Sequence, residues 1–485
     1  MCCKPINYSY HTFLQSELKM NFKEIVDKLR ENFNDGCIES YEKRKEQLLQ
    51  LRKLLVDNEK EFIEALWKDL HKSEQETLLY ETQFIVEEID QTISELKKWM
   101  ASKKVSKNIL QIIDGAYTKS EALGVVLIIG AWNFPVQLLL GPMIGAIAAG
   151  NAVVLKPSEL AVHTSSLISK LIPSYLSPDI VSVVTGGPEE TTSLLNNRFD
   201  HIFFTGSYSV GKIIYKAAAE HLTPITLELG GKCPVIIDDG VDINIVARRL
   251  AWGKLTNCGQ ICVAADYVLM VNKNKEQFIK VFKDSIKEFY GENIQESPDY
   301  CRIINERHFD RIIKLLNDTK GNVIIGGDSD KNNLYISPTV VDNVKEDDSL
   351  MSEELFAPIL PIMDVESIDK AIEFIKKKSK PLSLYLFSNN QVNINKVLNK
   401  TSSGNVLIND LLLNMCCEHL PFGGVGNSGF GRYHGKYTFD TFSHEKAVLH
   451  RTTWFENVLF MRYPPYGDYK INWAKRISKK IKVPF

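Results

Sequence analysis

The fold is decided by the stretch GVVLIIGAWNFP at residues 124–135. Its run from Val125 to Ile129 is apolar, β-branched and bounded by glycines, which is typical of a parallel strand buried on both faces. Similar runs follow at 151–157 (NAVVLKP), 181–187 (VSVVTGG) and 200–207 (DHIFFTGS), with helix-like segments between them. Strands that alternate with helices of about ten to fifteen residues predict a doubly wound α/β unit.

Regions of different character flank this unit. Residues 21–102 are charged and poor in glycine and proline, and their apolar residues recur at helical spacing, which predicts a set of helices. Short apolar runs between about 230 and 410 predict a second α/β unit. Within the first unit, the helix after NAVVLKP is expected from about Ser158 to Leu171.

Composition narrows the class of protein. The 485 residues exceed one typical domain of ~100–200 residues. The net charge of −2 argues against a broad attraction to nucleic acid or to anionic membranes. Nine cysteines without a CxxC pair or a Cys/His cluster predict reduced thiols, no zinc site and a reducing compartment. Without a signal peptide or an apolar run of ~18 residues, a cytoplasmic protein with no membrane span is expected.

Three polar residues in apolar surroundings carry the candidate chemistry. Cys262 stands in NCGQIC, where the Gly-Gln pair predicts a turn that exposes a thiol, although such a cysteine is more often part of a core. Glu228 in LELGGK is either a helix cap or structural ion-pair partner, or a general base beside a space that the glycines leave open. Asn133 in WNFP is either an Asx turn or a side-chain donor to an oxyanion.

The cofactor signal is indirect, because no GxGxxG follows the first strand. Instead, FTGSYSVG puts Gly206 and Gly211 between a strand and a helix, where backbone N–H groups can approach a pyrophosphate. Lys156 and Glu159 in LKPSE follow another strand, and a solvated strand–helix junction is the simpler interpretation of both. Each of these signals is weak by itself.

Taken together, WNFP, LKPSE, FTGS, LELGGK, GQxC, EELFAP and PFGG resemble the aldehyde dehydrogenase superfamily over residues 21–450. NCGQIC, PFGGVGNSG and GRYHGKYTFDTFSH are most similar to its class 3 and fatty aldehyde dehydrogenase branch. The resemblance implies a Rossmann-like cofactor domain, an α/β catalytic domain and a small oligomerisation arm. The implied boundaries are an N-terminal extension at 1–19, a cofactor domain at 20–100 and 124–228, a catalytic domain at 229–408, bridging segments at 101–123 and 409–450, and a basic tail at 451–485.

The resemblance also implies NAD(P)-dependent oxidation of medium- or long-chain aliphatic or aromatic aldehydes to carboxylic acids. Cys262 would form a thioester, Asn133 would stabilise the oxyanion, and Glu228 would activate the water that hydrolyses the thioester. A carboxylate at Glu159 should bind a 2′-hydroxyl and repel a 2′-phosphate, which favours NAD and leaves NADP open. The implied cofactor-binding residues are Trp132, Lys156, Glu159, Gly206, Ser207, Gly211, Leu229, Glu354 and Phe356.

Other functions compete with this one. Coenzyme A could accept the acyl group, but a water-activating base at Glu228 favours hydrolysis. A non-catalytic, crystallin-like structural protein would be free to lose the nucleophile, the base or the oxyanion donor, and all three are present. The expected partners are a small-molecule aldehyde and a second copy of the chain in a homodimer, with no nucleic acid.

Two further features stay open. Cys258 and Cys262 are either unlinked thiols or a pair that oxidation joins to inactivate the enzyme. The tail RYPPYGDYKINWAKRISKKIKVPF, residues 462–485, predicts a basic amphipathic helix with Trp473, Ile477 and Ile481 on one face. That helix either docks on its own or a partner subunit, or makes weak, salt-sensitive peripheral contact with an anionic membrane.

Overall fold

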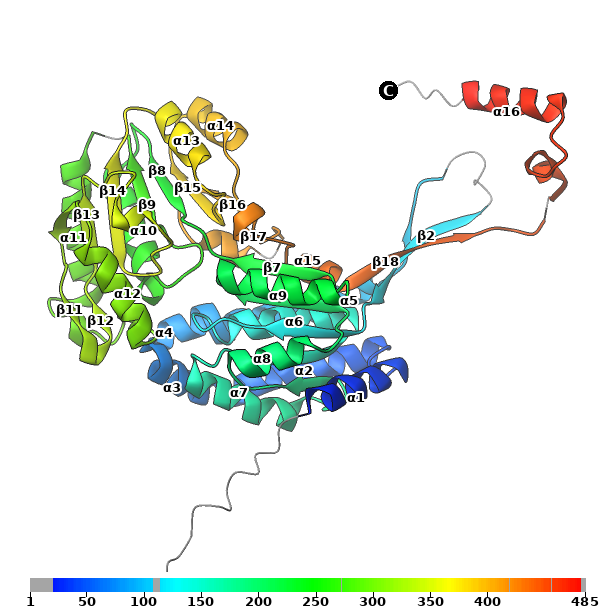
Figure 1. The fold of residues 1–485 in the computed structure, drawn as a ribbon, viewed down its shortest axis with the longest axis horizontal. Helices are drawn as coiled ribbons and strands as arrows, with labels where there is room; N and C mark the ends of the chain where they lie inside the picture. Colours follow the sequence, from blue (N-terminus) through cyan, green and yellow to red (C-terminus); the bar gives the residue numbers. More distant parts are fainter. Residues whose placement is uncertain (1–20, 108–113, 272, 418, 455, 481–485) are drawn as a thin grey trace, which may run out of the picture. The chain divides into compact units, whose positions relative to one another are not determined.

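The computed structural model describes residues 21–107, 114–271, 273–417, 419–454 and 456–480 (Figure 1). The expected extension at 1–19 lies outside these residues. Contacts between Cα atoms divide the described chain into a larger unit, which runs to Met100 and resumes over Glu121–His444, and a smaller one made of Ala101–Ser120 and the residues from Glu445 onward.

The first sheet of the larger unit confirms the expected α/β architecture. Its strand order is β17–β7–β6–β3–β4–β5, and it is parallel except for β17, which runs antiparallel to β7. Helices connect the parallel strands, as a doubly wound sheet requires. The elements are β3 (Val125–Ile129), α6 (Gln137–Ala149), β4 (Ala152–Lys156), α7 (Val162–Tyr175), β5 (Val181–Val183), α8 (Pro188–Leu195), β6 (His201–Gly206), α9 (Tyr208–Glu220), β7 (Ile225–Leu229) and β17 (Gly429–Phe430).

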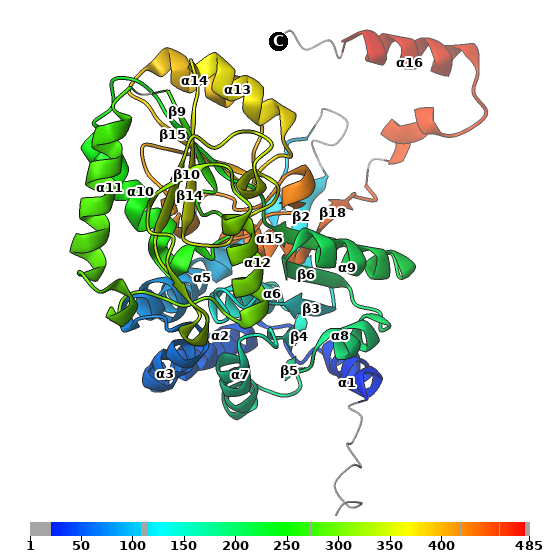
Figure 2. The same cartoon turned by 60° about the vertical axis from the view of Figure 1, so that its left-hand side comes forward.

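Side chains of this sheet alternate between two cores. Val126 and Ile128 of β3 pack into one apolar cluster, whereas Val125, Leu127 and Ile129 pack into another. This alternation follows from the two-residue period of a strand, and it explains why the whole run is apolar. Figure 2 shows α1, α8 and α9 on one side of the sheet and α2, α5 and α6 on the other.

The N-terminal residues form the expected helices. They include a π-helical turn at Leu78–Thr82, where the backbone widens within a helical stretch. Contacts tie α2 to α5, α6 and α7. The helices are α1 (Phe22–Asn34), α2 (Tyr41–Asp57), α3 (Glu59–Leu70), α4 (Glu74–Thr77) and α5 (Gln83–Met100).

Helix α7 begins at Val162, later than the expected start near Ser158. The Asp69 carboxylate of α3 accepts hydrogen bonds from the backbone N–H groups of His163 (2.9 Å) and Thr164 (2.8 Å). The orphan donors of the first turn are therefore capped by a residue about ninety positions away in sequence, which local sequence cannot reveal.

The second sheet of the larger unit has the order β10–β13–β14–β9–β8–β15–β16, with only β10 antiparallel to its neighbour. Its two faces also belong to different apolar clusters, with α10 and α11 on one side and α12, α13 and α14 on the other. The elements are β8 (Pro234–Ile237), α10 (Ile243–Leu255), β9 (Tyr267–Met270), α11 (Lys275–Tyr290), α12 (Glu306–Asn317), β10 (Asn322–Ile325), β13 (Thr339–Asp342), β14 (Ile359–Asp364), α13 (Ile368–Lys377), β15 (Ser383–Phe387), α14 (Gln391–Lys400) and β16 (Asn405–Ile408). Two short strands, β11 (Ser329–Asp330) and β12 (Tyr335–Ile336), form a separate antiparallel sheet.

Residues 409–444 group with the larger unit, which differs from the boundary predicted at residue 409. The reason is that β17 pairs with β7 and α15 (Lys436–Thr441) packs on α6.

The smaller unit contains a three-stranded sheet in the order β1–β2–β18 and the tail helix α16 (Asp468–Lys480). The strands are β1 (Lys103–Lys104), β2 (Gly115–Ala122) and β18 (Ser443–His450). Trp473 of α16 is 44% exposed, whereas the side chains of Ile477 and Ile481, two residues of the predicted apolar face, lie outside the described part. Across the described residues, no helix is both long and apolar enough to span a bilayer.

Candidate active site

Parallel register brings the predicted site residues to one edge of the first sheet. Asn133 follows β3, Lys156 ends β4, Gly206 ends β6, and Glu228 lies one residue before the end of β7. Because β3, β4, β6 and β7 are parallel, these four positions share the carboxyl edge, where α/β proteins bind ligands.

Cys262 follows a tightly constrained turn after α10. Asn257, Cys258 and Gly259 all have left-handed backbones, with φ of 49°, 55° and 71°. A Cβ on Gly259 would lie 2.3 Å from the carbonyl oxygen of Ala357, so this position has room for glycine only. The predicted Gly-Gln turn therefore exists, and Cys262 itself is half-buried.

Burial raises the pKa of the Cys262 thiol, and the nearby carboxyl groups of Glu354 and Glu228 raise it further. The backbone N–H groups of Cys262 and Val263 act in the opposite direction, because they favour the thiolate. The thiol thus lies within electrostatic reach of two carboxyl groups predicted for the site.

Glu228 is 3% exposed, and neither of its carboxyl oxygens has a hydrogen-bond partner within the described residues. Burial raises its pKa well above the usual value. An unpartnered buried carboxyl group is costly for stability, so it is typical of a site that receives water or a ligand. The structural ion-pair interpretation of Glu228 is therefore unsupported.

Asn133 is 3% exposed, and its side-chain Nδ2 donates to the carbonyl oxygen of Gln260 at 3.0 Å. An amide nitrogen carries two hydrogens, so a second donor remains beside the Cys262 loop. The Asx turn expected as the alternative would need Asn133 Oδ1 to accept from the backbone N–H two residues on, and Pro135 at that position has no N–H.

A small apolar pocket opens next to Cys262. Tyr433 and His434, which we did not single out from the sequence, form part of its wall. His434 has a left-handed backbone (φ 83°), stacks on Phe422 with ring centroids 5.2 Å apart, and has a pKa lowered to about 4 by burial. The lining residues are Phe134, Gln137, Leu138, Ile261, Cys262, Met415, Phe422, Tyr433 and His434.

The cofactor residues predicted near an adenine ribose and a pyrophosphate lie at or just after the carboxyl ends of β4 and β6. Lys156 Nζ lies 2.7 Å from a carboxylate oxygen of Glu159. Ser207 caps the N-terminus of α9, and its side chain accepts from the Val210 N–H at 3.4 Å. A Cβ on Gly206 would lie 2.5 Å from the Phe204 ring, and one on Gly211 would lie 2.8 Å from Leu229. The glycines therefore let α9 pack closely on β6 and β7, and the exposed Ser207 at the N-terminus of α9 lies where a dinucleotide phosphate can bind.

The residues predicted near a nicotinamide are Glu354 and Phe356. Glu354 comes so close to Gly230 that a Cβ there would lie 2.1 Å from its carboxyl oxygen, and its Oε1 lacks a partner in the described chain. Burial raises the Glu354 pKa to about 8. Trp132 contacts the Phe356 ring, with centroids 5.5 Å apart. A carboxyl group with one buried, unpartnered oxygen fits the ribose of a nicotinamide nucleotide, and the aromatic pair fits its planar ring.

Two neighbouring cysteines have distinct environments. Cys233 is fully buried, and its thiol donates to the carbonyl oxygen of Cys262 at 3.5 Å, so it helps to hold the nucleophile loop. Cys258 is also fully buried and belongs to the apolar cluster of the second sheet with Tyr300. Both Cys258 and Cys262 are free thiols in this structure. The oxidative link between Cys258 and Cys262 stays a hypothesis.

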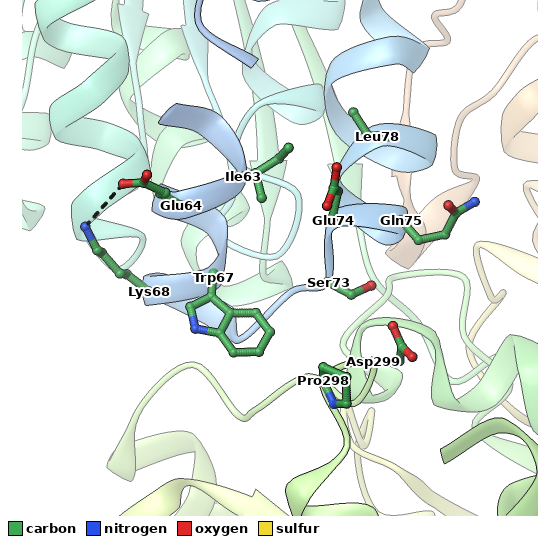
Figure 3. A pocket seen from close by; sticks show the side chains of 10 residues that line it. All are labelled: Ile63, Glu64, Trp67, Lys68, Ser73, Glu74, Gln75, Leu78, Pro298 and Asp299. Atoms are coloured by element: carbon green, nitrogen blue, oxygen red, sulfur yellow. Dashed lines mark ion pairs between the residues drawn. The ribbon is translucent and has the colours of Figure 1, made fainter. Parts of the chain in front are cut away.

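A larger surface hollow lies elsewhere, between α3, α4 and the Pro298–Asp299 loop (Figure 3). Trp67 and Pro298 face it, and Lys68 pairs with Glu64 at its rim. None of the residues predicted for catalysis or cofactor binding lines this hollow. It therefore does not compete with Cys262 as the candidate active site.

Comparisons with known proteins agree with this geometry. The chain is 48% identical over 450 residues to aldehyde dehydrogenase family 3 member A2 of Macaca fascicularis, which covers 93% of this chain and 92% of that one. It is 47% identical to the mouse aldehyde dehydrogenase described as dimeric and NADP-preferring, over 92% of this chain and 98% of the mouse chain. A solved structure, the substrate-bound state of Staphylococcus aureus AldH, matches with a TM-score of 0.91 and 43% identity over 94% of this chain and 99% of that one. Residues 2–448 match the model of the aldehyde dehydrogenase family, to which this chain therefore belongs.

Proposed function

We propose that this protein oxidises aldehydes to carboxylic acids with NAD(P) through a thioester on Cys262. The observation that carries the proposal is the proximity of three polar functions. The Cys262 thiol lines an apolar pocket, the Asn133 amide is bonded to Gln260 two residues before it, and the unpartnered Glu228 carboxyl group is close enough to raise the pKa of the thiol. Family membership supports the reaction class, and the geometry supports the role of each residue.

The chemistry needs an addition, a hydride transfer and a hydrolysis. The Cys262 thiolate adds to the aldehyde carbon, and the former carbonyl oxygen becomes an oxyanion that accepts from Asn133 Nδ2. A bound nicotinamide supplies the acceptor for the hydride that leaves this carbon. Glu228 then takes a proton from water as that water attacks the thioester, which releases the carboxylate and restores the Cys262 thiolate.

The cofactor site fits either nicotinamide nucleotide. Glu159 should accept from a ribose 2′-hydroxyl, whereas its ion-pair partner Lys156 offers a cation for a 2′-phosphate. The name of the mouse relative supports NADP use in related proteins. We therefore retain NAD as the expected cofactor, with NADP as a second one.

The substrates that suit the pocket are medium- or long-chain aliphatic or aromatic aldehydes. Its lining next to Cys262 is apolar and aromatic and includes Leu138, Met415 and Phe422. Such a wall favours a hydrocarbon tail or a ring over a charged group.

The experiment that tests the proposal is NADH formation with hexanal, for the wild type and for Cys262→Ser, with and without coenzyme A. Turnover without coenzyme A that disappears in Cys262→Ser supports the thioester mechanism with hydrolysis. Formation of acyl-coenzyme A would favour the acylating alternative. The absence of turnover with both nucleotides across several aldehydes would favour the structural, crystallin-like alternative.

We also propose a cytoplasmic homodimer, with the basic tail as a weak peripheral contact for anionic membranes. The support is the cysteine composition, which favours a reducing compartment, the name of the dimeric mouse relative, and the basic residues around the exposed Trp473. Liposome flotation with anionic lipid at low salt tests the membrane contact, and a protein that stays unbound there would remove it. Sedimentation equilibrium tests the dimer.

A further inference from the structure

A buried ion pair contacts the segment between β3 and α6 that contains Asn133, which we call the Asn133 loop. Lys72 connects α3 to α4, Glu81 lies in the π-helical turn, and the side chains of both are fully buried. The Lys72 Nζ donates to Glu81 Oε1 at 2.6 Å and to the carbonyl oxygen of Asn133 at 3.0 Å. It also lies 4.1 Å from the centre of the Phe134 ring, within the range of a cation–π contact.

The other oxygen of Glu81 holds the next residues of the same loop. Glu81 Oε2 accepts from the backbone N–H groups of Val136 and Gln137, both at 3.0 Å. These are the first, otherwise unbonded donors of helix α6, so the carboxylate caps that helix. The Lys72–Glu81 pair therefore holds the Asn133 loop at two points.

The opposite side of the loop is tied to the nucleophile turn. Asn257 Nδ2 donates to the carbonyl oxygens of Asn133 (2.9 Å) and Gln260 (3.1 Å). The backbone N–H of Asn257 donates to the Glu76 carboxylate at 3.0 Å. The Asn133 carbonyl oxygen thus accepts from both Lys72 and Asn257, which leaves the loop little freedom to move.

We propose that Lys72 and Glu81 are positioning residues that fix Asn133 at the distance from Cys262 that oxyanion stabilisation needs. Hydrophobic side chains in the same place would serve stability as well as a buried ion pair does, so its presence needs another explanation. Oxyanion donors act through placement before the reaction begins, and small displacements of them are expensive in rate. The inference rests on the role proposed above for Asn133.

The test is a double-mutant cycle on kcat with Asn133→Ala, Lys72→Met and the double variant. We expect Asn133→Ala to lower kcat about 10²- to 10³-fold. Lys72→Met should lower it about ten- to a hundredfold, with little change in the KM for NAD. The double variant should be no slower than Asn133→Ala alone, since a residue that acts only through Asn133 has nothing further to remove.

Matched controls come from exposed residues of α3 and α4, the two helices that Lys72 connects. Lys68→Met removes an exposed lysine that pairs with Glu64 at 4.0 Å, and Glu74→Gln removes an exposed carboxylate of α4 (Figure 3). Both controls should keep wild-type kcat. If Lys72→Met does not fold, Glu81→Gln is nearly isosteric, and the same cycle with Asn133→Ala decides the question.

The outcomes distinguish the role of Asn133 from that of the Lys72–Glu81 pair. Multiplicative losses in the double variant, or a wild-type kcat in Lys72→Met, would overturn the positioning role and leave that of Asn133 intact. A wild-type kcat in Asn133→Ala would overturn the role of Asn133 and the positioning role together. The inference is supported if the double variant is no slower than Asn133→Ala and if both controls unfold at the wild-type temperature.

Discussion

The two sides of the candidate active site differ in how their buried polar atoms are paired. On the oxyanion side, Asn133 accepts hydrogen bonds from Lys72 and Asn257 and donates one to Gln260. Asn257 Oδ1 is a buried atom on this side that has no partner among the described residues. On the side of the base and the cofactor, both oxygens of Glu228, Glu354 Oε1 and Lys232 Nζ lack hydrogen-bond partners in the described residues.

This difference follows from what each side does. A donor that stabilises developing charge works best when its position is fixed beforehand, so it gains from a dense network. A base and a ribose ligand must keep their polar atoms available for water and cofactor. Leaving such groups buried and unpaired lowers stability, and this loss is tolerated because the function needs their polar atoms free.

The largest effect is expected for Glu228→Gln. Without a base, the thioester should form but hydrolyse slowly, so steady-state turnover should fall about 10²- to 10⁴-fold. A first burst of NADH, about one per active site, should remain. Rapid-mixing absorbance measures both quantities.

The exposed Glu220 at the end of α9 provides the matched control, and Glu220→Gln should behave like the wild type. A Glu228→Gln variant that loses its burst in proportion to its turnover would contradict the assignment, because the step before hydrolysis would then depend on Glu228 as well.

The second prediction concerns the turn that holds Cys262. Gly259→Ala combines a left-handed backbone with a Cβ 2.3 Å from the Ala357 carbonyl oxygen, whereas Gly240→Ala has a similar φ of 75° and open space around the Cβ. We expect Gly240→Ala to lower the free energy of unfolding by about 1 kcal/mol. Gly259→Ala should lower it by about 3 kcal/mol, since a backbone clash is added to the strain.

Thermal unfolding of both variants measures the difference, and kcat should fall in Gly259→Ala alone. Equal losses of stability would mean that the contact with Ala357 contributes nothing beyond backbone conformation.

The sequence singled out the candidate site residues but not their support. Cys262, Glu228 and Asn133 belong to short motifs, and it was the resemblance of the whole motif set to one family, not any single local pattern, that implied their roles. Lys72 and Glu81 belong to a charged helical region in which nothing distinguishes a buried charge from a solvated one. Their roles depend on contacts across 61 and 55 residues, and on a π-helical turn that has no clear sequence signature.

The same reason explains why two boundaries in the structure differ from the expected ones. The start of α7 is set by Asp69 of another helix, and residues 409–444 group with the larger unit because β17 adds to β7. Both are tertiary contacts, which override local propensity. Tyr433 and His434 were missed because aromatic residues in a glycine-rich segment are common in ordinary loops.

The third prediction is that activity rises with pH. Cys262 and Glu228 both act in their deprotonated forms, and burial raises the pKa of both, so we expect the active fraction to grow as the pH rises. Below the pKa of the thiol, kcat/KM should increase about tenfold per pH unit. The pH profile of NADH formation measures this increase.

Glu228→Gln sharpens the same comparison, because the Glu228 carboxyl group raises the pKa of Cys262. Its removal should move the pH dependence of thiol alkylation by iodoacetamide to lower pH. A profile that is flat from neutral to alkaline pH in the wild type would contradict the expected titration.

The smallest effect is expected where a polar group near the cofactor does have a partner in the protein. Glu159 pairs with Lys156 at 2.7 Å, so its repulsion of a 2′-phosphate is already partly neutralised. Glu159→Gln should therefore lower the KM for NADP only severalfold, to about tenfold, while the KM for NAD rises slightly. Glu189→Gln, an exposed carboxylate of α8, is the control and should leave both values unchanged. Equal shifts for both nucleotides would mean that Glu159 does not contact the ribose, and Lys156 would then be the only group of this pair that distinguishes the two cofactors.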